Sequence, residues 1–240
     1  MDMKIIGVDC ATAAAKVGLA LGVLSSDGVE IQDATLCTLK KSAAMVIGGW
    51  LKGGEGPALI ALDAPLGWPK PLAESLINHK AGRALGASAH AMFRRETDRF
   101  IHRKLKKTPL DVGADRIART AHAALQLLAT LRSDLGLPIP LAWDPADVST
   151  VAAIEVYPAA TLRTYGIPSA GFKKLEQVAR RNEIPKALCA DCKLMEPHRA
   201  LDLCKTSDLL DAAICVLAGH DFVRERAMIP EDRELAEREG

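Results

Sequence analysis

The sequence predicts an α/β protein built on a mixed five-stranded sheet, with strands one to three antiparallel and strands four and five parallel to the first. Three observations predict this fold. Apolar runs at 4–9, 17–24 and 29–39 follow one another with short turns between them, as in an antiparallel meander. The segment 41–52 then takes helical spacing, and 58–62 is again strand-like. A helix between two strands is a crossover, so we expect the first and fourth strands side by side and parallel.

A helical insertion is predicted to follow the fourth strand. Helical spacing dominates from about 70 to 135, and breaks at Pro109 and Gly113 start its last helix near residue 114. We expect a single domain at 1–223 that contains this insertion. The remaining segment, 224–240, is strongly charged, and we expect it to fray.

The second half of the chain is predicted to complete the sheet and cover it. A fifth strand at 151–156 has Glu155 near its end. Short helices are expected at 158–165 and 172–181. A strong apolar helix is expected at 207–223, with Ser207 as its N-cap.

The composition of the 240 residues excludes several classes of protein. Hydrophobic residues make up 49% of the chain, enough for a sizeable core, and the net charge is only +1. Aromatic residues make up 4%, too few for a platform that stacks single-stranded bases. No apolar run approaches the roughly 18 residues of a membrane helix, and the first residues lack a signal-peptide pattern. We therefore expect a cytoplasmic protein with reduced cysteines and no membrane partner.

Acidic residues stand where two predicted strands end. Asp9 closes the first strand and Asp63 closes the fourth. Because parallel neighbours end at the same edge of a sheet, these two carboxylates are expected to lie close together. Like charges at that distance repel unless a cation neutralises them or one carboxyl holds a proton. Taken alone, Asp9 is equally consistent with a turn cap, and Asp63 with an Asx-turn.

Two more acids begin the last predicted helix. Asp208 and Asp211 are three positions apart and therefore share a helix face. Asp208 is well explained by the helix dipole alone. Asp211 lies one turn inside an otherwise apolar helix, where a charge without a partner is costly. The four acids together predict a site for a hard divalent ion such as Mg²⁺.

Four segments of the chain resemble the family called domain of unknown function 429. They are the strand ending in Asp9, the Asp-x-Pro-x-Gly element at 63–67, the Glu-Val-Tyr-Pro element at 155–158, and the helix start at 207–212. Members of that family are described as predicted nucleases of ribonuclease H-like fold. The stretch 208–219 also resembles the last catalytic helix of RuvC-type Holliday-junction resolvases.

The resemblance implies a ribonuclease H-like fold and a metal-dependent phosphodiesterase site. Asp9 would be the central ligand, Asp63 would replace the acid of the fourth strand, and Asp211 with Asp208 would come from the last helix. Glu155 matches the family and joins the catalytic candidates. Two Mg²⁺ or Mn²⁺ ions would then activate a water and stabilise the leaving oxygen. A nucleic acid or nucleotide phosphodiester would be the substrate, and resolvase-like relatives suggest a homodimer.

Two other functions fit the same fold. A binding module that uses the acids only structurally would bind no metal. A phosphotransferase of the actin-like type would place nucleotide phosphate at the turn 9–18, which has a faint likeness to that class in Asp9, Thr12 and Gly18. Such enzymes need a second domain to enclose the nucleotide, and 240 residues leave little room for one.

A dense basic run is a candidate for substrate binding. Seven of the 14 residues at 94–107 are Lys or Arg, and two are acids. They could grip phosphates, and the family resemblance extends to Arg95, Asp98 and Arg99. A solvated helix face is the competing explanation. Lys173, after the fifth strand, could neutralise a developing charge or simply lie on the surface.

A weaker pattern points to zinc. Cys189 and Cys192 form a Cys-x-x-Cys pair, followed by His198 and Cys204 within the predicted loop 183–205. Four such ligands could close a structural zinc site. The second paired spacing typical of such sites is absent, so a set of reduced thiols is the simpler interpretation.

Overall fold

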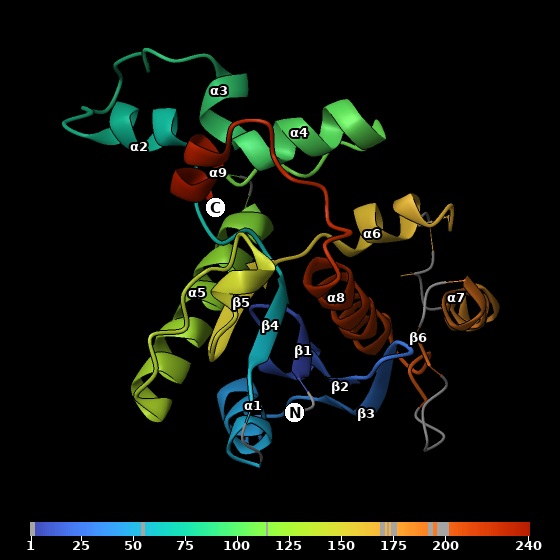
Figure 1. Ribbon diagram of the computed structural model, residues 1–240. Helices are drawn as coiled ribbons and strands as arrows, with labels where there is room; N and C mark the ends of the chain where they lie inside the picture. Colours follow the sequence, from blue (N-terminus) through green and yellow to red (C-terminus); the bar gives the residue numbers. More distant parts are fainter. Residues whose placement is uncertain are drawn as a thin grey trace. The chain divides into compact units, whose positions relative to one another are not determined.

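The computed structural model describes residues 3–53, 56–113, 115–168, 171, 173, 177–191, 194–195 and 202–240, without the side chains of 189–191 and 194–195. The chain forms two compact units. The first comprises residues 1–64 and 123–227, and the second comprises 65–122 and 228–240. Figure 1 shows the elements of both.

The first unit contains the predicted mixed sheet. Strands β1, β2 and β3 are antiparallel, β4 and β5 run parallel to β1, and a short β6 adds a parallel strand beside β3. The order is β5-β4-β1-β2-β3-β6, so the predicted ribonuclease H-like arrangement of five strands is confirmed. The sequence did not predict β6. The strands are β1 Lys4–Asp9, β2 Gly18–Leu24, β3 Val29–Leu36, β4 Ala58–Asp63, β5 Val151–Glu155 and β6 Leu194–Met195.

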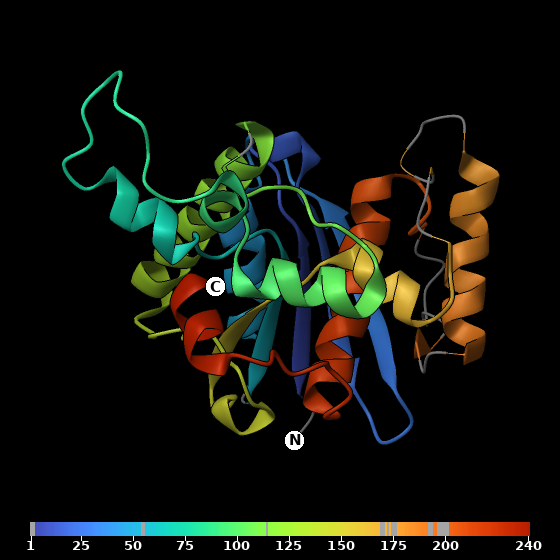
Figure 2. The same cartoon turned by 90° about the horizontal axis from the view of Figure 1, so that it is seen from above.

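Helices cover both faces of this sheet (Figure 2). Helix α8 packs on one face against β1 to β4, and α1 and the second half of α5 lie on the other. The crossover helix and the last helix of the insertion are confirmed within one or two residues. The helices of this unit, with the whole of α5, are α1 Ala43–Lys52, α5 Asp115–Leu135, α6 Pro158–Thr164, α7 Val178–Asp191 and α8 Ser207–Val223, with 3-10 turns at Ala14–Lys16 and Pro145–Asp147.

Helix α8 lies unusually close to the sheet because two strand positions are glycine. A Cβ on Gly7 would stand 2.0 Å from the Ala212 carbonyl oxygen, and one on Gly18 would stand 2.2 Å from the Asp208 carbonyl oxygen. No real Cβ makes such contacts. Since side chains alternate along a strand, Gly7 and Asp9 share the face that α8 covers. The glycines therefore bring the acidic start of α8 to the end of β1.

Two sequence expectations for this unit were wrong. A helix was expected at 172–181, with a loop from 183, but the described helix α7 runs over 178–191 with Pro185 inside it. Its residues Ile184 and Leu188 are buried in one core cluster with residues of α8. This packing outweighs the tendency of Pro185 to break a helix. The N-cap of α8 is Thr206, whose side chain accepts a hydrogen bond from the Leu209 N–H, and not Ser207.

The second unit is helical. A backbone hydrogen bond joins the end of α3 to the segment before α5: the Phe93 carbonyl accepts from the Val112 N–H. The charged end of the chain does not fray: Asp232 caps a helix whose Ala236 and Glu239 are buried. Besides the start of α5, the helices are α2 Lys70–Leu76, α3 Ala89–Phe93, α4 Glu96–Leu105 and α9 Arg233–Glu239. Throughout the described residues, no helix is both long enough and apolar enough to cross a membrane.

Candidate metal centre

The first two acids meet at the edge of the sheet because their strands are parallel neighbours. Asp9 and Asp63 are the last residues of β1 and β4, and the register pairs them directly. The residues before these positions are apolar and buried, from Ile5 to Val8 in β1 and from Ala58 to Leu62 in β4. A register shift of one residue would turn either carboxylate to the opposite face. The packing of the strand cores therefore fixes both acids on the face of α8.

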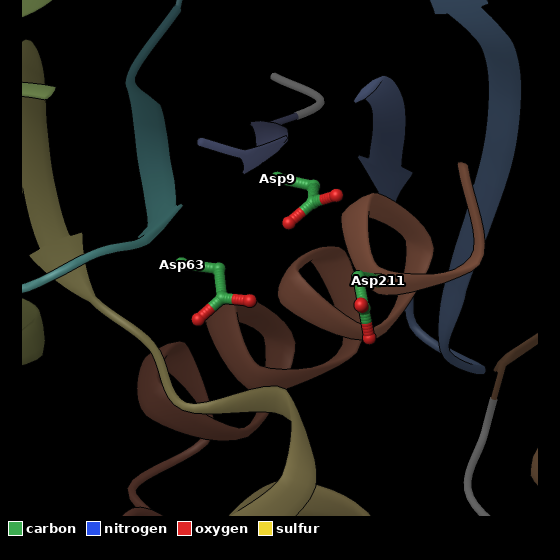
Figure 3. Close-up of side chains that lie close together, drawn as sticks. All are labelled: Asp9, Asp63 and Asp211. Carbon is green, nitrogen blue, oxygen red and sulfur yellow. The ribbon is translucent and has the colours of Figure 1, made fainter. Parts of the chain in front are cut away.

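The third acid comes from α8. Asp211 lies one turn inside the helix, with a side chain that is only 1% exposed. One carboxylate oxygen from each of Asp9, Asp63 and Asp211 can be chosen so that all three lie within 4.8 Å of one another. Figure 3 shows the three carboxylates converging from two strand ends and the helix. We call these three residues the acid cluster.

The acid cluster is electrostatically strained. Burial, with the charges of Asp211 and Asp63, raises the pKa of Asp9 to about 9. Burial and Asp211 raise the pKa of Asp63 to about 7. Burial also raises the pKa of Asp211. Near neutral pH the cluster therefore favours retaining a proton or recruiting a cation.

The donor atoms fit a hard divalent ion. Asp211 Oδ1 is buried and has no hydrogen-bond partner among the described residues. A buried carboxylate oxygen without a partner is costly, and a cation would remove that cost. Three carboxylates in reach of one point are the ligands that Mg²⁺ and Mn²⁺ prefer, whereas softer metals favour thiolates and imidazoles. The residues present thus fit the metal predicted from the sequence.

Comparison with known proteins identifies the family. A family model described as "Protein of unknown function (DUF429)" matches residues 7–235. The chain belongs to this family. The resemblance noted from the sequence is therefore confirmed over almost the whole chain.

A solved structure that resembles the chain was also found. It is RuvC of T. thermophilus in complex with a Holliday junction substrate, with 13% sequence identity and a TM-score of 0.37. The match covers 94% of this chain and 98% of that one. No curated protein matches the chain.

Two further acids of the family pattern lie outside the acid cluster. Asp208 is in the first turn of α8, where it accepts a hydrogen bond from the Ser207 hydroxyl, and its charge raises the pKa of Asp9. Glu155 pairs in register with Leu62, not with Asp63. Strand alternation therefore directs its side chain away from the face of α8. Its charge is still near enough to raise the pKa of Asp63.

Lys173 contacts the cluster directly. Its ammonium Nζ lies 2.6 Å from Asp211 Oδ2, while its side chain is 59% exposed. Burial lowers the pKa of Lys173, but the nearby carboxylates of Asp211, Asp63 and Asp9 raise it by more, so the group stays charged. The sequence predicted a substrate-binding role for Lys173 and did not predict this ion pair. Its role toward substrate stays a prediction.

Two thiols beside the cluster were not singled out from the sequence. Cys215 is fully buried one turn after Asp211, and Cys10 follows Asp9. Each sulfur lies 3.9 Å from the Val8 carbonyl oxygen. Burial raises the pKa of both thiols well above the usual range, so they remain neutral and are poor metal ligands. Only their spacing from the acids could have drawn attention to them.

The basic run has partners inside the second unit. Arg95 is 2% exposed, forms a two-pronged ion pair with Asp98, and donates to the Gly240 backbone oxygen. Arg99 pairs with Glu96 and Glu239. These contacts give the side chains a structural role in this unit. Substrate binding by Arg95, Asp98 and Arg99 stays a prediction.

The predicted zinc ligands fall mostly outside the described residues. This holds for Cys192, His198 and the side chain of Cys189. Cys204 is described, and its thiol donates to the Arg181 carbonyl oxygen. The zinc site is therefore an untested prediction.

Proposed function

We propose that the protein is a metal-dependent hydrolase of phosphodiester bonds, a nuclease that acts through the acid cluster. The observation that carries the proposal is the convergence of Asp9, Asp63 and Asp211 within 4.8 Å on an apolar scaffold. An apolar core tolerates such a cluster only at a cost in stability. Proteins accept that kind of cost most often at functional sites.

The three acids of the cluster differ in how deeply they are buried. Asp211 is held rigidly inside α8, whereas Asp9 and Asp63 stand partly exposed at the strand ends. The three would hold Mg²⁺ or Mn²⁺, with Asp208 as a further ligand. The bound metal would supply an activated water and polarise the phosphoryl oxygens. The buried strands and the close packing of α8 keep the carboxylates in place, so little reorganisation is needed during the reaction.

Nucleic acid is the proposed substrate class. Support comes from the resemblance of the acid pattern to ribonuclease H-like nucleases, and from the preference of phosphate oxygens for hard divalent ions. Catalytic involvement of Glu155, a second metal ion, a homodimer and a cytoplasmic location belong to the same proposal.

Hydrolysis of a substrate panel tests the function. Labelled single- and double-stranded DNA, RNA, an RNA–DNA hybrid and a branched junction are each incubated with Mn²⁺ or Mg²⁺. We expect metal-dependent cleavage of at least one substrate. Asp9→Asn and Asp211→Asn should each lower the rate by more than about a hundredfold, because a metal ligand is lost. Asp27→Asn, at the exposed turn between β2 and β3, is the matched control and should cleave normally.

Two results would contradict the proposal. One is the absence of any cleavage by folded wild-type protein with metal bound. The other is undiminished cleavage by Asp211→Asn.

Stability measurements test the metal site without a substrate. Asp9→Asn removes an ionisable carboxyl group that burial and like charges destabilise, so the metal-free variant should be more stable than wild type by about 0.5–2 kcal/mol. Wild type should gain about 2.7 kcal/mol from Mn²⁺ at a hundred times its dissociation constant, and the variant should gain less. Thermal unfolding with chelator and with Mn²⁺ measures both. Identical behaviour of the two proteins would rule out a metal site at Asp9.

A further inference from the structure

The acid cluster has a positive charge of its own chain beside it. Lys173 Nζ lies 2.6 Å from Asp211 Oδ2, within hydrogen-bonding distance. Within the described part of the chain, this is the one ion pair that involves a member of the cluster. Among the described residues, the three carboxyl groups therefore have a single ammonium beside them.

The same carboxylate is needed by a metal ion. Mg²⁺ binds carboxylate oxygens at 2.0–2.1 Å and demands near-octahedral geometry. An ammonium 2.6 Å from Asp211 Oδ2 occupies a direction of approach to that oxygen and repels an incoming divalent cation. A metal ion on Oδ1, which has no hydrogen-bond partner among the described residues, would also lie close to the ammonium and be repelled by it, so the two cations compete for Asp211.

Lys173 is placed so that it can give way. Its partner Asp211 is 1% exposed and fixed on α8, whereas the lysine side chain is 59% exposed. A lysine side chain is long and flexible, and its ammonium is strongly hydrated in water. Displacement by a metal ion would move the ammonium into solvent and would not require any change in α8 or the sheet.

We propose that Lys173 is a tethered cation that competes with divalent metal for Asp211 and thereby weakens metal binding by the acid cluster. This inference rests on the proposed metal site. It assigns Lys173 a role before any substrate binds. The lysine ammonium stabilises the metal-free cluster, and metal binding replaces that ammonium with a divalent ion. The opposite arrangement, in which Lys173 supports the bound metal, predicts the opposite change in affinity when the lysine is removed.

Calorimetric titration of metal-free protein with Mn²⁺ distinguishes the two arrangements. Lys173→Met removes the competing charge and keeps an unbranched side chain of similar length. We expect the dissociation constant for Mn²⁺ to fall by about tenfold, which corresponds to about 1.4 kcal/mol. Lys173→Arg keeps the positive charge and should bind Mn²⁺ within about twofold of wild type. Lys40→Met, at an exposed position of the same unit, is the control and should not change the affinity.

The metal-free variants provide a second measurement. Without Lys173 the three carboxylates lose their ammonium, so Lys173→Met should melt at a lower temperature than wild type in chelator. The difference should shrink when Mn²⁺ is added. Lys173→Gln, which retains polarity, is measured beside it so that a folding defect specific to methionine is recognised.

The outcomes separate this inference from the proposed function. Unchanged or weaker Mn²⁺ binding by both uncharged variants would overturn the role of Lys173 and leave the nuclease proposal intact. Failure of wild type and variants alike to bind Mn²⁺ would overturn both. Tighter binding by the variants together with no cleavage of any substrate would support the inference and contradict the nuclease.

Discussion

Two groups of buried charges in this molecule differ in how their charges are balanced. In the second unit, Arg95 meets both carboxylate oxygens of Asp98, at 3.1 Å and 3.0 Å. Glu239, 1% exposed, accepts hydrogen bonds from the backbone N–H groups of Lys70 and Glu96. In the acid cluster of the first unit, three carboxyl groups converge, and the described residues supply one ion pair to them, that of Asp211 with Lys173.

We infer that this difference separates a structural group of charges from the proposed functional one. Where buried charges are paired, as in Arg99 with Glu239, the contacts hold helices together. Where like charges converge, their pKa values rise, and a retained proton or a bound cation would compensate the charge. The run of charge that is most visible in the sequence, 94–107, contributes Arg95, Asp98 and Arg99 to the paired group. The acid cluster is formed by three acids that are far apart in the sequence.

The largest expected effect comes from breaking the paired group. Arg95→Met would leave Asp98 buried without its ion-pair partner, so we expect the free energy of unfolding to fall by about 3–5 kcal/mol. Denaturant unfolding followed by circular dichroism measures this loss. Mn²⁺ affinity of the folded variant should not change. As a control, Arg119→Met removes an exposed partner of Asp115 and should cost far less. A comparably small loss in Arg95→Met would mean that the pair contributes no net stability.

A smaller effect is expected from moving α8 away from the sheet. In Gly18→Ala the new Cβ would meet the Asp208 carbonyl oxygen at 2.2 Å, so the start of the helix must shift. We expect a loss of about 1–3 kcal/mol in stability. Mn²⁺ affinity should also fall, because Asp211 moves with the helix.

Gly48→Ala is the matched control for that substitution. Its Cβ would meet nothing within 4 Å, and it lies within α1, where alanine favours the helix. It should therefore raise stability slightly and leave Mn²⁺ affinity unchanged. If Gly18→Ala also kept its Mn²⁺ affinity, close packing of α8 would not be what positions Asp211.

The smallest expected effect, per pH unit, is the change in stability of the metal-free protein with pH. Asp9 and Asp63 have folded-state pKa values of about 9 and about 7, above the value of about 3.9 in the unfolded chain. The folded protein therefore binds more protons than the unfolded chain between these pKa values. Its stability falls as the pH rises from about 3.9 towards about 7 for Asp63 and about 9 for Asp9. The slope should be about 1.4 kcal/mol per pH unit for each carboxyl that holds its proton only in the folded state.

Melting temperatures at pH 5 to 8, in chelator and in Mn²⁺, measure that slope. Mn²⁺ should flatten it, because the bound ion replaces the protons. Asp9→Asn should also flatten it in chelator. A metal-free stability that rises with pH over this range would show that the carboxylates are compensated from within the protein.

Much of the site could be predicted from the sequence. Two apolar runs that each end in an acid, with a crossover helix between them, require Asp9 and Asp63 to lie at one edge of the sheet. Asp211 stood out as a charge inside an apolar helix. These are local patterns of strand, turn and helix, and local patterns are encoded by neighbouring residues.

Tertiary structure decided the rest. The register of β5 pairs Glu155 with Leu62 and so directs it away from the face of α8. The pairing of Lys173 with Asp211, and of the basic run with Glu239 near the end of the chain, joins residues that no local pattern relates. A run of charged residues has the same appearance in the sequence whether its side chains are solvated or form ion pairs. Their roles depend on long-range packing, because the energy of a charge is determined by its burial and by the charges that the fold brings beside it.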